Sequence, residues 1–393
     1  MKILVANLGS TSFKFRLFDM QGELKLARGA VERIGSPESK AFVEVAEQRQ
    51  DLTLHAPDHA VALRWSLEQL TQLGCLLSMS DLAAIGFKAV HAQGLSGVQL
   101  VTDAVLDAMQ AFNNVAPAHN PPYVQAMRLL SAQFPEIPLV AAFETGFHQT
   151  IPQGNRYYAI PLEWSTQYGI LRYGFHGASH RYISTRIAEI LMRQDLRIIS
   201  CHLGGSSSLC AIHAGKSIAC SLGMSPQSGL PHNNRVGDFD IFALPIILQS
   251  TGLTLEKVLE KLASQAGLFG ISGFNDLRDI EAAATKGDPK ARLALDIFVS
   301  SVRHYLGAYL VALGGADVIV FTGGIGENSV QMRAEICANL HELGIQLDSD
   351  SNNRAKGEMA IHSADSRIQI WTMPTNEEII VARLTYDLIR GGK

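Results

Sequence analysis

The sequence predicts an α/β protein of two related domains, each a mixed sheet flanked by helices. Three observations lead to this fold class. At 393 residues, 47% of them hydrophobic, the chain is too long for one ordinary core. A pattern of three short strands, joined first by a glycine–hydroxyl turn and then by a second turn, occurs twice. Helical stretches lie between and after the two copies, as in sheets covered on both faces.

The first copy occupies the first 35 residues. Residues 3–7 form an apolar run typical of a buried strand, and residues 13–18 alternate as a half-buried strand does. A turn at Gln21 and Gly22 leads to a third strand over residues 24–31. The first two strands are joined by residues 8–12, in which one glycine precedes three hydroxyl residues.

The second copy begins near residue 200. Residues 197–201 form an apolar strand, and a glycine–hydroxyl turn over residues 203–208 follows it. Residues 209–212 and 218–222 are the second and third strands, with a turn at Ala214 and Gly215 between them. The expected covering helices include residues 122–134, 180–193 and 291–313.

The glycine turns are candidate phosphate sites. Glycine lets the backbone approach a phosphate closely, and successive N–H groups with nearby hydroxyls form a concavity that binds anions. One such turn usually only reverses the chain. Two equivalent turns in a duplicated frame favour a polyphosphate held from both sides. A third glycine cluster, residues 322–328, follows a buried strand over residues 318–321 and lacks the GxGxxG spacing, which favours a mononucleotide.

Charge and composition exclude several classes of partner. Lys and Arg number 33 against 37 Asp and Glu, a net charge of −4, which argues against nucleic acid and against an anionic membrane surface. The N-terminus carries one basic residue and no long apolar stretch, so we expect no signal peptide. The apolar segment 306–324 is interrupted and reads as a buried helix followed by a buried strand.

The cysteines show neither a CxxC pair nor a metal-ligand spacing with histidine. We expect them to be reduced, buried thiols in a cytoplasmic protein. They are Cys75, Cys201, Cys210, Cys220 and Cys337.

Four motifs make the reading more specific. Residues 7–14 read N-L-G-S-T-S-F-K, residues 172–181 read R-Y-G-F-H-G-A-S-H-R, residues 321–329 read F-T-G-G-I-G-E-N-S, and residues 375–378 read T-N-E-E. In order and spacing, from residue 3 to about 385, the chain resembles the acetate kinase family of the acetate and sugar kinase, Hsp70 and actin superfamily.

The resemblance implies a fold in more detail. It implies two duplicated ribonuclease H-like (actin-like ATPase) domains with the nucleotide in the cleft between them. Domain I would hold residues 1–146 and 374–393, and domain II residues 147–373. A homodimer formed through domain II is also implied.

The resemblance further implies an activity and the residues that perform it. The protein would phosphorylate a short-chain carboxylate reversibly with ATP and Mg²⁺, giving ADP and an acyl phosphate. Asn7 and Glu377 would lie near the metal ion, partly through water. Glu144, His176 and Arg235 would be catalytic. The acid would contact Lys88, Val90, Ala118, Phe175 and Pro226. The nucleotide would contact Ser10, Ser12, Lys14, His202, Leu203, Gly204, Gly205, Ser206, Asp276, Leu277, Arg278, Gly323, Gly324, Ile325, Gly326 and Glu327.

The chemistry accounts for these residue types independently. A carboxylate is already a nucleophile at neutral pH, so phosphoryl transfer needs alignment and charge neutralisation rather than a general base. We expect direct in-line transfer, and the sequence leaves a phosphoenzyme open. Taken singly, His176 is also consistent with a turn histidine, and Arg235 with an ion pair to Asp238. Glu377 and Glu378 are also consistent with partners of a helix N-terminus.

Several departures from the family pattern fall in the predicted site. Glu144 replaces an aspartate and so shifts the carboxylate, and Lys88 replaces an arginine and so loses its bidentate fork. The family's H-G-G-E reads H-A-Q-G at residues 91–94, and its N-G after H-L-G reads Gly205-Ser206. Its G-L-M-M-G-T-R-S-G-D reads G-L-P-H-N-N-R-V-G-D at residues 229–238.

These departures suggest a different acid. Ala118 stands where the family usually has leucine, and Gly94 lacks a side chain nearby, so the acyl pocket should be larger. We expect an acid larger than acetate, or one with an extra polar group that Gln93, His232 or Asn233 would meet.

Two alternatives remain open. One is a kinase of the same fold that acts on another small molecule, and the other is a catalytically weak nucleotide-binding paralogue. Glu144 and Lys88 favour these alternatives. The carboxylate kinase is favoured by the retained Asn7, His176, Arg235 and Glu377, because a protein that only binds nucleotide needs no phosphoryl-stabilising set.

Overall fold

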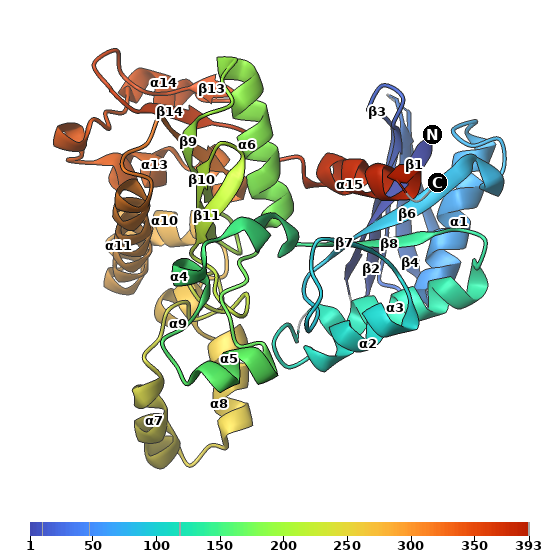
Figure 1. Cartoon of the computed structure of the whole chain (residues 1–393), viewed down its shortest axis with the longest axis horizontal. Coiled ribbons are helices and arrows are strands. Elements are labelled where there is room, and N and C mark those ends of the chain that lie inside the picture. The colour runs from blue at the N-terminus through green and yellow to red at the C-terminus, as the bar shows by residue number, and fades with distance from the viewer. Residues whose placement is uncertain (10, 47, 118, 392–393) are drawn as a thin grey trace. The chain divides into compact units, whose positions relative to one another are not determined.

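The computed structural model describes residues 1–9, 11–46, 48–117 and 119–391. Contacts within the chain divide it into two compact units (Figure 1). Unit 1 comprises Met1–Gln149 and the C-terminal segment that begins at Asn376, and unit 2 comprises Thr150–Thr375. Two residues predicted to bind ligands, Ser10 and Ala118, lie outside the described residues.

Unit 1 is built on a mixed sheet with the strand order β5-β4-β3-β2-β1-β6-β8-β7. Strands β1 to β5 are antiparallel neighbours, β6 is parallel to β1, and β8 is parallel to β6. The three predicted strands of the first copy are confirmed as β1 to β3. The strands are β1 (Lys2–Gly9), β2 (Ser12–Asp19), β3 (Leu24–Glu32), β4 (Ser39–Val45), β5 (Gln48–Leu54), β6 (Leu82–Ala89), β7 (Val98–Leu100) and β8 (Leu139–Phe143).

Helices cover both faces of this sheet. Side chains alternate along β6, so Ile85 and Phe87 join the core formed with the first three helices. Gly86 between them faces the last helix, where an added Cβ would overlap Thr385 Oγ1. The chain therefore returns to unit 1 at its end (Figure 1). The helices are α1 (His59–Gln72), α2 (Asp103–Ala111), α3 (Asn120–Gln133) and α15 (Glu377–Gly391), with short turns η1 (Met79–Asp81) and η2 (Gly146–Thr150).

Unit 2 repeats this topology in the order β11-β10-β9-β12-β14-β13. Its first five strands match β3-β2-β1-β6-β8 in order and direction, because β9 to β11 are antiparallel while β12 and β14 run parallel to β9. The duplicated ribonuclease H-like arrangement is thereby confirmed. The strands are β9 (Arg197–His202), β10 (Ser208–His213), β11 (Lys216–Cys220), β12 (Val318–Thr322), β13 (Met359–Ala360) and β14 (Gln369–Thr372).

One strand of the second copy differs from its prediction. The structure places β11 at Lys216–Cys220, two residues earlier than residues 218–222. Ala214 and Gly215 both adopt positive φ, at 46° and 75°, and form a two-residue turn. The strand therefore starts directly after Gly215.

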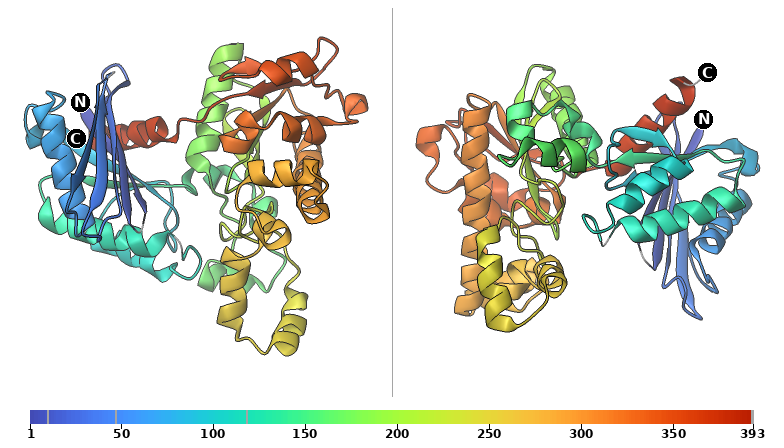
Figure 2. Two further views of the ribbon diagram at one scale, coloured as in Figure 1. Left: turned by 180° about the vertical axis from the view of Figure 1, so that it is seen from behind. Right: turned by 60° about the horizontal axis from the view of Figure 1, so that its bottom comes forward.

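Helices also cover both faces of the second sheet (Figure 2). Ser200 of β9 bonds to His180 of α6, whereas its neighbours Ile199 and Cys201 pack in the core with Phe298 of α11. The helices are α4 (Gln153–Arg156), α5 (Leu162–Tyr168), α6 (Gly177–Leu191), α7 (Leu244–Thr251), α8 (Leu255–Ser264), α9 (Gly267–Ser272), α10 (Leu277–Thr285), α11 (Pro289–Ala312), α12 (Gly323–Asn328), α13 (Val330–Cys337) and α14 (Ser349–Arg354), with η3 (Ile241–Ala243) and η4 (His341–Leu343).

The apolar segment 306–324 is divided between α11 and β12, as predicted. Among the helices that the structure describes, none alone has the length and hydropathy of a bilayer span. Ile241–Thr251 and Leu255–Ser264 meet that test only as a pair, and a bend of 113° separates them. Burial raises the pKa of the Cys201 and Cys337 thiols, as expected for unreactive core cysteines.

Candidate active site

Two glycine turns of unit 2 are joined through the backbone of Leu203. The Leu203 N–H donates to the Thr322 carbonyl at 2.8 Å, and the Leu203 carbonyl accepts the N–H groups of Ile325 at 2.8 Å and Gly326 at 3.1 Å. Gly323 has φ 78°, and a Cβ there would lie 2.7 Å from the Leu203 carbonyl oxygen. Only glycine allows this approach. Residues 203–206 and 323–326, both predicted to contact the nucleotide, therefore lie side by side.

A pocket of about 440 Å³ opens against these turns. Three of its segments are the ones predicted for the nucleotide, and the volume falls in the usual range for small-molecule sites. The lining comprises Gly204, Gly205, Asn233, Asp276, Leu277, Arg278, Glu281, Gly324, Ile325, Asn328 and Ser329.

Two carboxylates hold the walls of this pocket in place. Asp276 is the N-cap residue of α10, where it accepts the Arg278 N–H at 2.9 Å. Its hydrogen bonds to the Arg278 side chain and backbone lower the pKa of Asp276 to about 2. Glu327 accepts the Gly323 N–H at 3.0 Å, so Glu327 stabilises the turn itself.

A buried histidine supports the turn at residues 204–207 through a hydrogen bond. His232 is 0% exposed, its Nδ1 accepts the Ser207 N–H at 3.0 Å, and its Nε2 lies 3.3 Å from the Ser228 carbonyl. Because Nδ1 accepts, the proton is on Nε2 and is donated to Ser228. Burial, and then the charge of Arg235, lower the pKa of His232 to about 3. The expectation that His232 meets a polar group of the acid is wrong, because both of its nitrogens are bonded inside unit 2.

Three histidines gather beside the same turn. His176 precedes α6 with φ 56° and ψ 30°, a left-handed conformation that is uncommon for histidine. Its Nδ1 lies 2.8 Å from Ser208 Oγ, and its ring stacks on His202 with centroids 4.3 Å apart. Ser208 Oγ also lies 2.9 Å from Nε2 of His180. The structure therefore brings His176 and His202 together.

Sequence reasoning missed two members of this cluster. Ser208 bridges His176 and His180, and His180 reaches Ser200 through Nδ1 at 2.9 Å. The His180 N–H donates to the carbonyl of His176 at 2.9 Å, one turn earlier, so the spacing of four residues was a usable signal.

Arg235 and Pro226, predicted for catalysis and for acid binding, are also in contact. The Arg235 Nη1 donates to the Pro226 carbonyl at 2.7 Å, and burial lowers the pKa of the guanidinium to about 10. Arg235 remains a cation at neutral pH. The Asp238 carboxylate instead accepts the Gly229 N–H and the Tyr305 hydroxyl. Phe175, predicted for the acid pocket, is buried directly before His176.

In unit 1, an ion pair joins two other predicted residues. Lys88 Nζ of β6 lies 2.6 Å from Glu377 Oε2 at the start of α15. Burial opposes the charged ammonium, but the charges of Glu377 and Glu144 outweigh it and raise the pKa of Lys88. Glu144 is 5% exposed, and its N–H donates to the Ala89 carbonyl at 2.8 Å. Lys88 therefore lies within the electrostatic range of both carboxylates.

Tyr123 of α3 forms a hydrogen bond to Asn7, another predicted site residue of unit 1. Its hydroxyl donates to Asn7 Oδ1 at 2.9 Å and accepts the Leu8 N–H at 3.1 Å. Burial raises the pKa of Tyr123 to about 12, although the charge of Lys88 opposes this, so the phenol keeps its proton. No sequence motif singled out Tyr123.

The predicted magnesium ligands fit a hard cation. Asn7 and Glu377 supply an amide oxygen and a carboxylate, which suit Mg²⁺. The Lys88 ammonium group lies 2.6 Å from Glu377 Oε2, so this carboxylate already has a cation beside it. Within the described residues, no group of three or more His, Cys, Asp or Glu could hold a metal ion.

Three further predicted residues of unit 1 lie on β2 or directly after β6. Lys14 pairs with Asn7 across β1 and β2, and both line a pocket of about 210 Å³. Ser12 begins β2, and Val90 is buried directly after β6.

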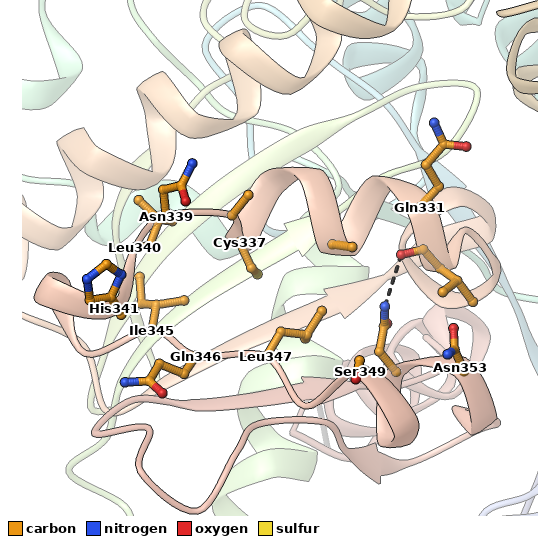
Figure 3. A pocket seen from close by; sticks show the side chains of 14 residues that line it. Gln331, Cys337, Asn339, Leu340, His341, Ile345, Gln346, Leu347, Ser349 and Asn353 are labelled. Carbon is orange, nitrogen blue, oxygen red and sulfur yellow. Dashed lines mark hydrogen bonds between the residues drawn. The ribbon is translucent and has the colours of Figure 1, made fainter. Parts of the chain in front are cut away.

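A third pocket, of about 610 Å³, lies between α13 and α14 (Figure 3). None of the predicted site residues lines it. Asn352 borders it and donates to the Val330 carbonyl at 3.0 Å. Behind it, the buried Arg333 donates to Asn352 Oδ1 at 2.7 Å and to the Gly326 and Glu327 carbonyls at 2.9 and 2.8 Å. Arg333 therefore fixes the end of α12.

The buried neutral His232 predicts a specific pH dependence. Its folded pKa of about 3 lies below the ordinary 6.5, so only the unfolded chain takes up this proton between those values. Stability contributed by neutral His232 is present above pH 6.5 and is lost as the pH falls. The loss should reach about 1.4 kcal/mol at pH 5.5.

Urea unfolding at pH 7.5 and 5.5 measures this loss. His232→Asn keeps an acceptor for the Ser207 N–H but cannot be protonated, so its stability should fall by about 1.4 kcal/mol less than that of the wild type. His213→Asn, at an exposed position, serves as the control. Equal pH dependence in His232→Asn and the wild type would contradict the buried neutral state.

Comparison with known proteins agrees with the motifs and the fold. The model of the Acetokinase family matches residues 2–383. The chain is 41% identical to the acetate kinase of Shouchella clausii (strain KSM-K16), covering 98% of this chain and 99% of that protein. It is 39% identical to the acetate kinase of Bacillus subtilis (strain 168), covering 100% of each.

Solved structures agree as well. The crystal structure of Porphyromonas gingivalis acetate kinase superposes with a TM-score of 0.89 at 36% identity, covering 99% of each chain. A propionate kinase from Francisella tularensis subsp. tularensis SCHU S4 gives a TM-score of 0.89 at 34% identity, covering 98% of each chain. The resemblance predicted from the four motifs is confirmed, and the chain belongs to the Acetokinase family.

Proposed function

We propose that this protein transfers a phosphoryl group from ATP to the carboxylate of a short-chain acid, reversibly giving ADP and an acyl phosphate. The observation that carries the proposal is the pair of joined glycine turns beside a nucleotide-sized pocket, in a chain that belongs to the Acetokinase family. The similar proteins are named for acetate and propionate, both short carboxylates.

In the proposed reaction, a carboxylate oxygen of the acid attacks the γ-phosphorus while the bond to the β,γ-bridging oxygen breaks. The acid is ionised at neutral pH, so no general base is needed. His176 and Arg235 stabilise charge on the equatorial oxygens of the migrating group. The stacking of His176 on His202 and its contact with Ser208 support this assignment, because they hold the imidazole in one orientation.

Lys88 is assigned to the carboxylate of the acid, and the charges of Glu377 and Glu144 keep its ammonium group charged. Asn7 and Glu377 would hold Mg²⁺, and a bound Mg²⁺ supplies charge neutralisation on the phosphates. Tyr123 supports this group by fixing the amide oxygen of Asn7 through its hydroxyl.

We further propose that the preferred acid is longer than acetate. In the sequence, Ala118 and Gly94 are smaller than the residues of the family pattern at these positions. Gly94 is exposed, and a Cβ built there meets no heavy atom within 4 Å. Val90 and Phe175 are buried apolar residues suited to an alkyl chain.

A second candidate is a nucleotide-binding protein with weak catalysis. The observation that favours it is the 2.6 Å ion pair between Lys88 and Glu377, which engages a predicted acid-binding residue with a predicted metal ligand. The same assay separates the two candidates.

An acyl-hydroxamate assay with ATP and Mg²⁺ across C2 to C6 acids tests the proposal. We expect kcat/KM to rise from acetate to propionate or butyrate by about tenfold per methylene, until the pocket is filled. A clear preference for acetate would reject the larger acid. Nucleotide binding without phosphorylation of any acid would reject the kinase and favour the second candidate.

The double variant Glu144→Asp/Lys88→Arg sharpens this assay. It restores the family's aspartate and arginine, so acetate turnover should rise or the range of acids should broaden. Glu260→Asp/Lys257→Arg makes the same chemical changes in an exposed ion pair of α8 and should leave turnover unchanged. Equal acetate turnover in the wild type and the site variant would argue against the assigned roles.

We also propose that the protein is a homodimer formed through unit 2. Helix α7 has no buried residue, and Ile241, Phe242 and Ile246 are 67%, 80% and 66% exposed. Clustered apolar side chains of this kind are typical of protein interfaces.

Sedimentation velocity tests the dimer. The molar mass obtained for the wild type should be twice the 42.6 kDa of one chain. The molar mass obtained for Phe242→Glu/Ile246→Glu should be that of one chain. Leu77→Glu, at an exposed apolar residue of unit 1, is the control and should stay dimeric. A monomeric wild type, or a dimer that resists the double change, would refute this interface.

A further inference from the structure

Two departures from the family pattern form a reciprocal exchange. The pattern places asparagine directly after H-L-G and glycine fifth in G-L-M-M-G-T-R-S-G-D. This chain has Gly205 at the first position and Asn233 at the second. One asparagine has been lost from one loop and gained in another, which suggests that the two positions face each other.

The structure brings the two positions together. The Asn233 N–H donates to the Gly205 carbonyl at 3.1 Å. A Cβ added to Gly205 would lie 3.4 Å from Asn233 Nδ2 and 3.8 Å from its Cγ. A longer side chain at 205 would therefore compete with Asn233 for the same space. The exchange moves an amide from one wall of the site to the facing wall.

The orientation of the Asn233 amide is fixed by its neighbours. Nδ2 donates to the Asn275 carbonyl at 2.8 Å, and a carbonyl can only accept, so Oδ1 must point the other way. Oδ1 is buried and has no hydrogen-bond partner among the described residues. A buried acceptor without a partner is costly, so a donor that reached Oδ1 from a ligand in the adjoining pocket would stabilise the bound state.

The position of Asn233 indicates which part of a nucleotide supplies that donor. Asn233 lines the 440 Å³ pocket, between Gly205 of a phosphate-type turn and Asp276 of the segment predicted for adenosine. Ionised phosphates offer acceptors, whereas ribose hydroxyls offer donors. The ribose connects the phosphates to the base and so belongs between those two segments.

We propose that Asn233 is a specificity-determining residue of the nucleotide site, whose Oδ1 accepts a hydrogen bond from a ribose hydroxyl. The assignment rests on the proposed use of ATP and names a contact that the family pattern places on another loop. It replaces the expectation that Asn233 meets a polar group of the acid. The protein should therefore discriminate ribose from deoxyribose through this one side chain.

Isothermal titration calorimetry with ADP, 2′-deoxy-ADP, 3′-deoxy-ADP and inosine diphosphate tests this assignment. The wild type should bind ADP about tenfold more tightly than one of the deoxy nucleotides. In Asn233→Gly, ADP should bind about tenfold more weakly and the deoxy discrimination should fall below about twofold. Asn234→Gly, whose side chain does not line the pocket, is the matched control and should retain wild-type binding.

The reciprocal variants test the exchange itself. Gly205→Asn should weaken ADP binding, because two amides compete for one space, and Gly205→Asn/Asn233→Gly should recover at least part of the affinity. Thermal melts without ligand confirm that each variant is folded.

Each result has one meaning. Unchanged ADP affinity and unchanged ribose preference in folded Asn233→Gly would overturn the proposal, as would discrimination against inosine diphosphate alone, which indicates the base amine. A wild type that binds none of these nucleotides would instead overturn the proposed use of ATP.

Discussion

The backbone of Leu203 joins the two glycine turns on which the rest of the site depends. Its N–H and carbonyl bind both ends of the segment 322–326, and Gly323 must adopt positive φ for the two chains to meet. Strand order makes this possible, because β9 and β12 are parallel neighbours and the turns follow their carboxyl ends. His232 and Arg333 then hold the two turns from behind through buried hydrogen bonds.

In unit 1, by contrast, ionisable groups lie close together and do not exchange protons. Lys88 remains charged because Glu377 and Glu144 outweigh its burial, and Tyr123 keeps its proton because it is buried beside Asn7. In the proposed reaction, these groups would exchange partners when the substrate carboxylate or the metal ion binds. The turns in unit 2 instead rely on backbone hydrogen bonds, and Arg235 is a buried cation in the same unit.

Local patterns predicted the frame well, because strand periodicity and glycine turns are short-range signals. The two copies of three strands followed from them, whereas the shared role of residues 203–206 and 323–326 was implied only by the family resemblance. The supporting contacts could not be predicted, because they join residues far apart in sequence, as Tyr123 and Asn7 do across 116 positions. His232 was assigned to the wrong partner for the same reason, since the sequence does not show that Ser207 lies over its ring. The early start of β11 depended on two positive φ angles that composition alone does not reveal.

A crystal structure of the protein with ADP tests the central claim most directly. If the joined turns are the phosphate site, the phosphate oxygens will lie within hydrogen-bond distance of backbone N–H groups in residues 204–206 and 324–326. ADP bound elsewhere in the molecule, with both turns contacting only protein or water, would contradict the account.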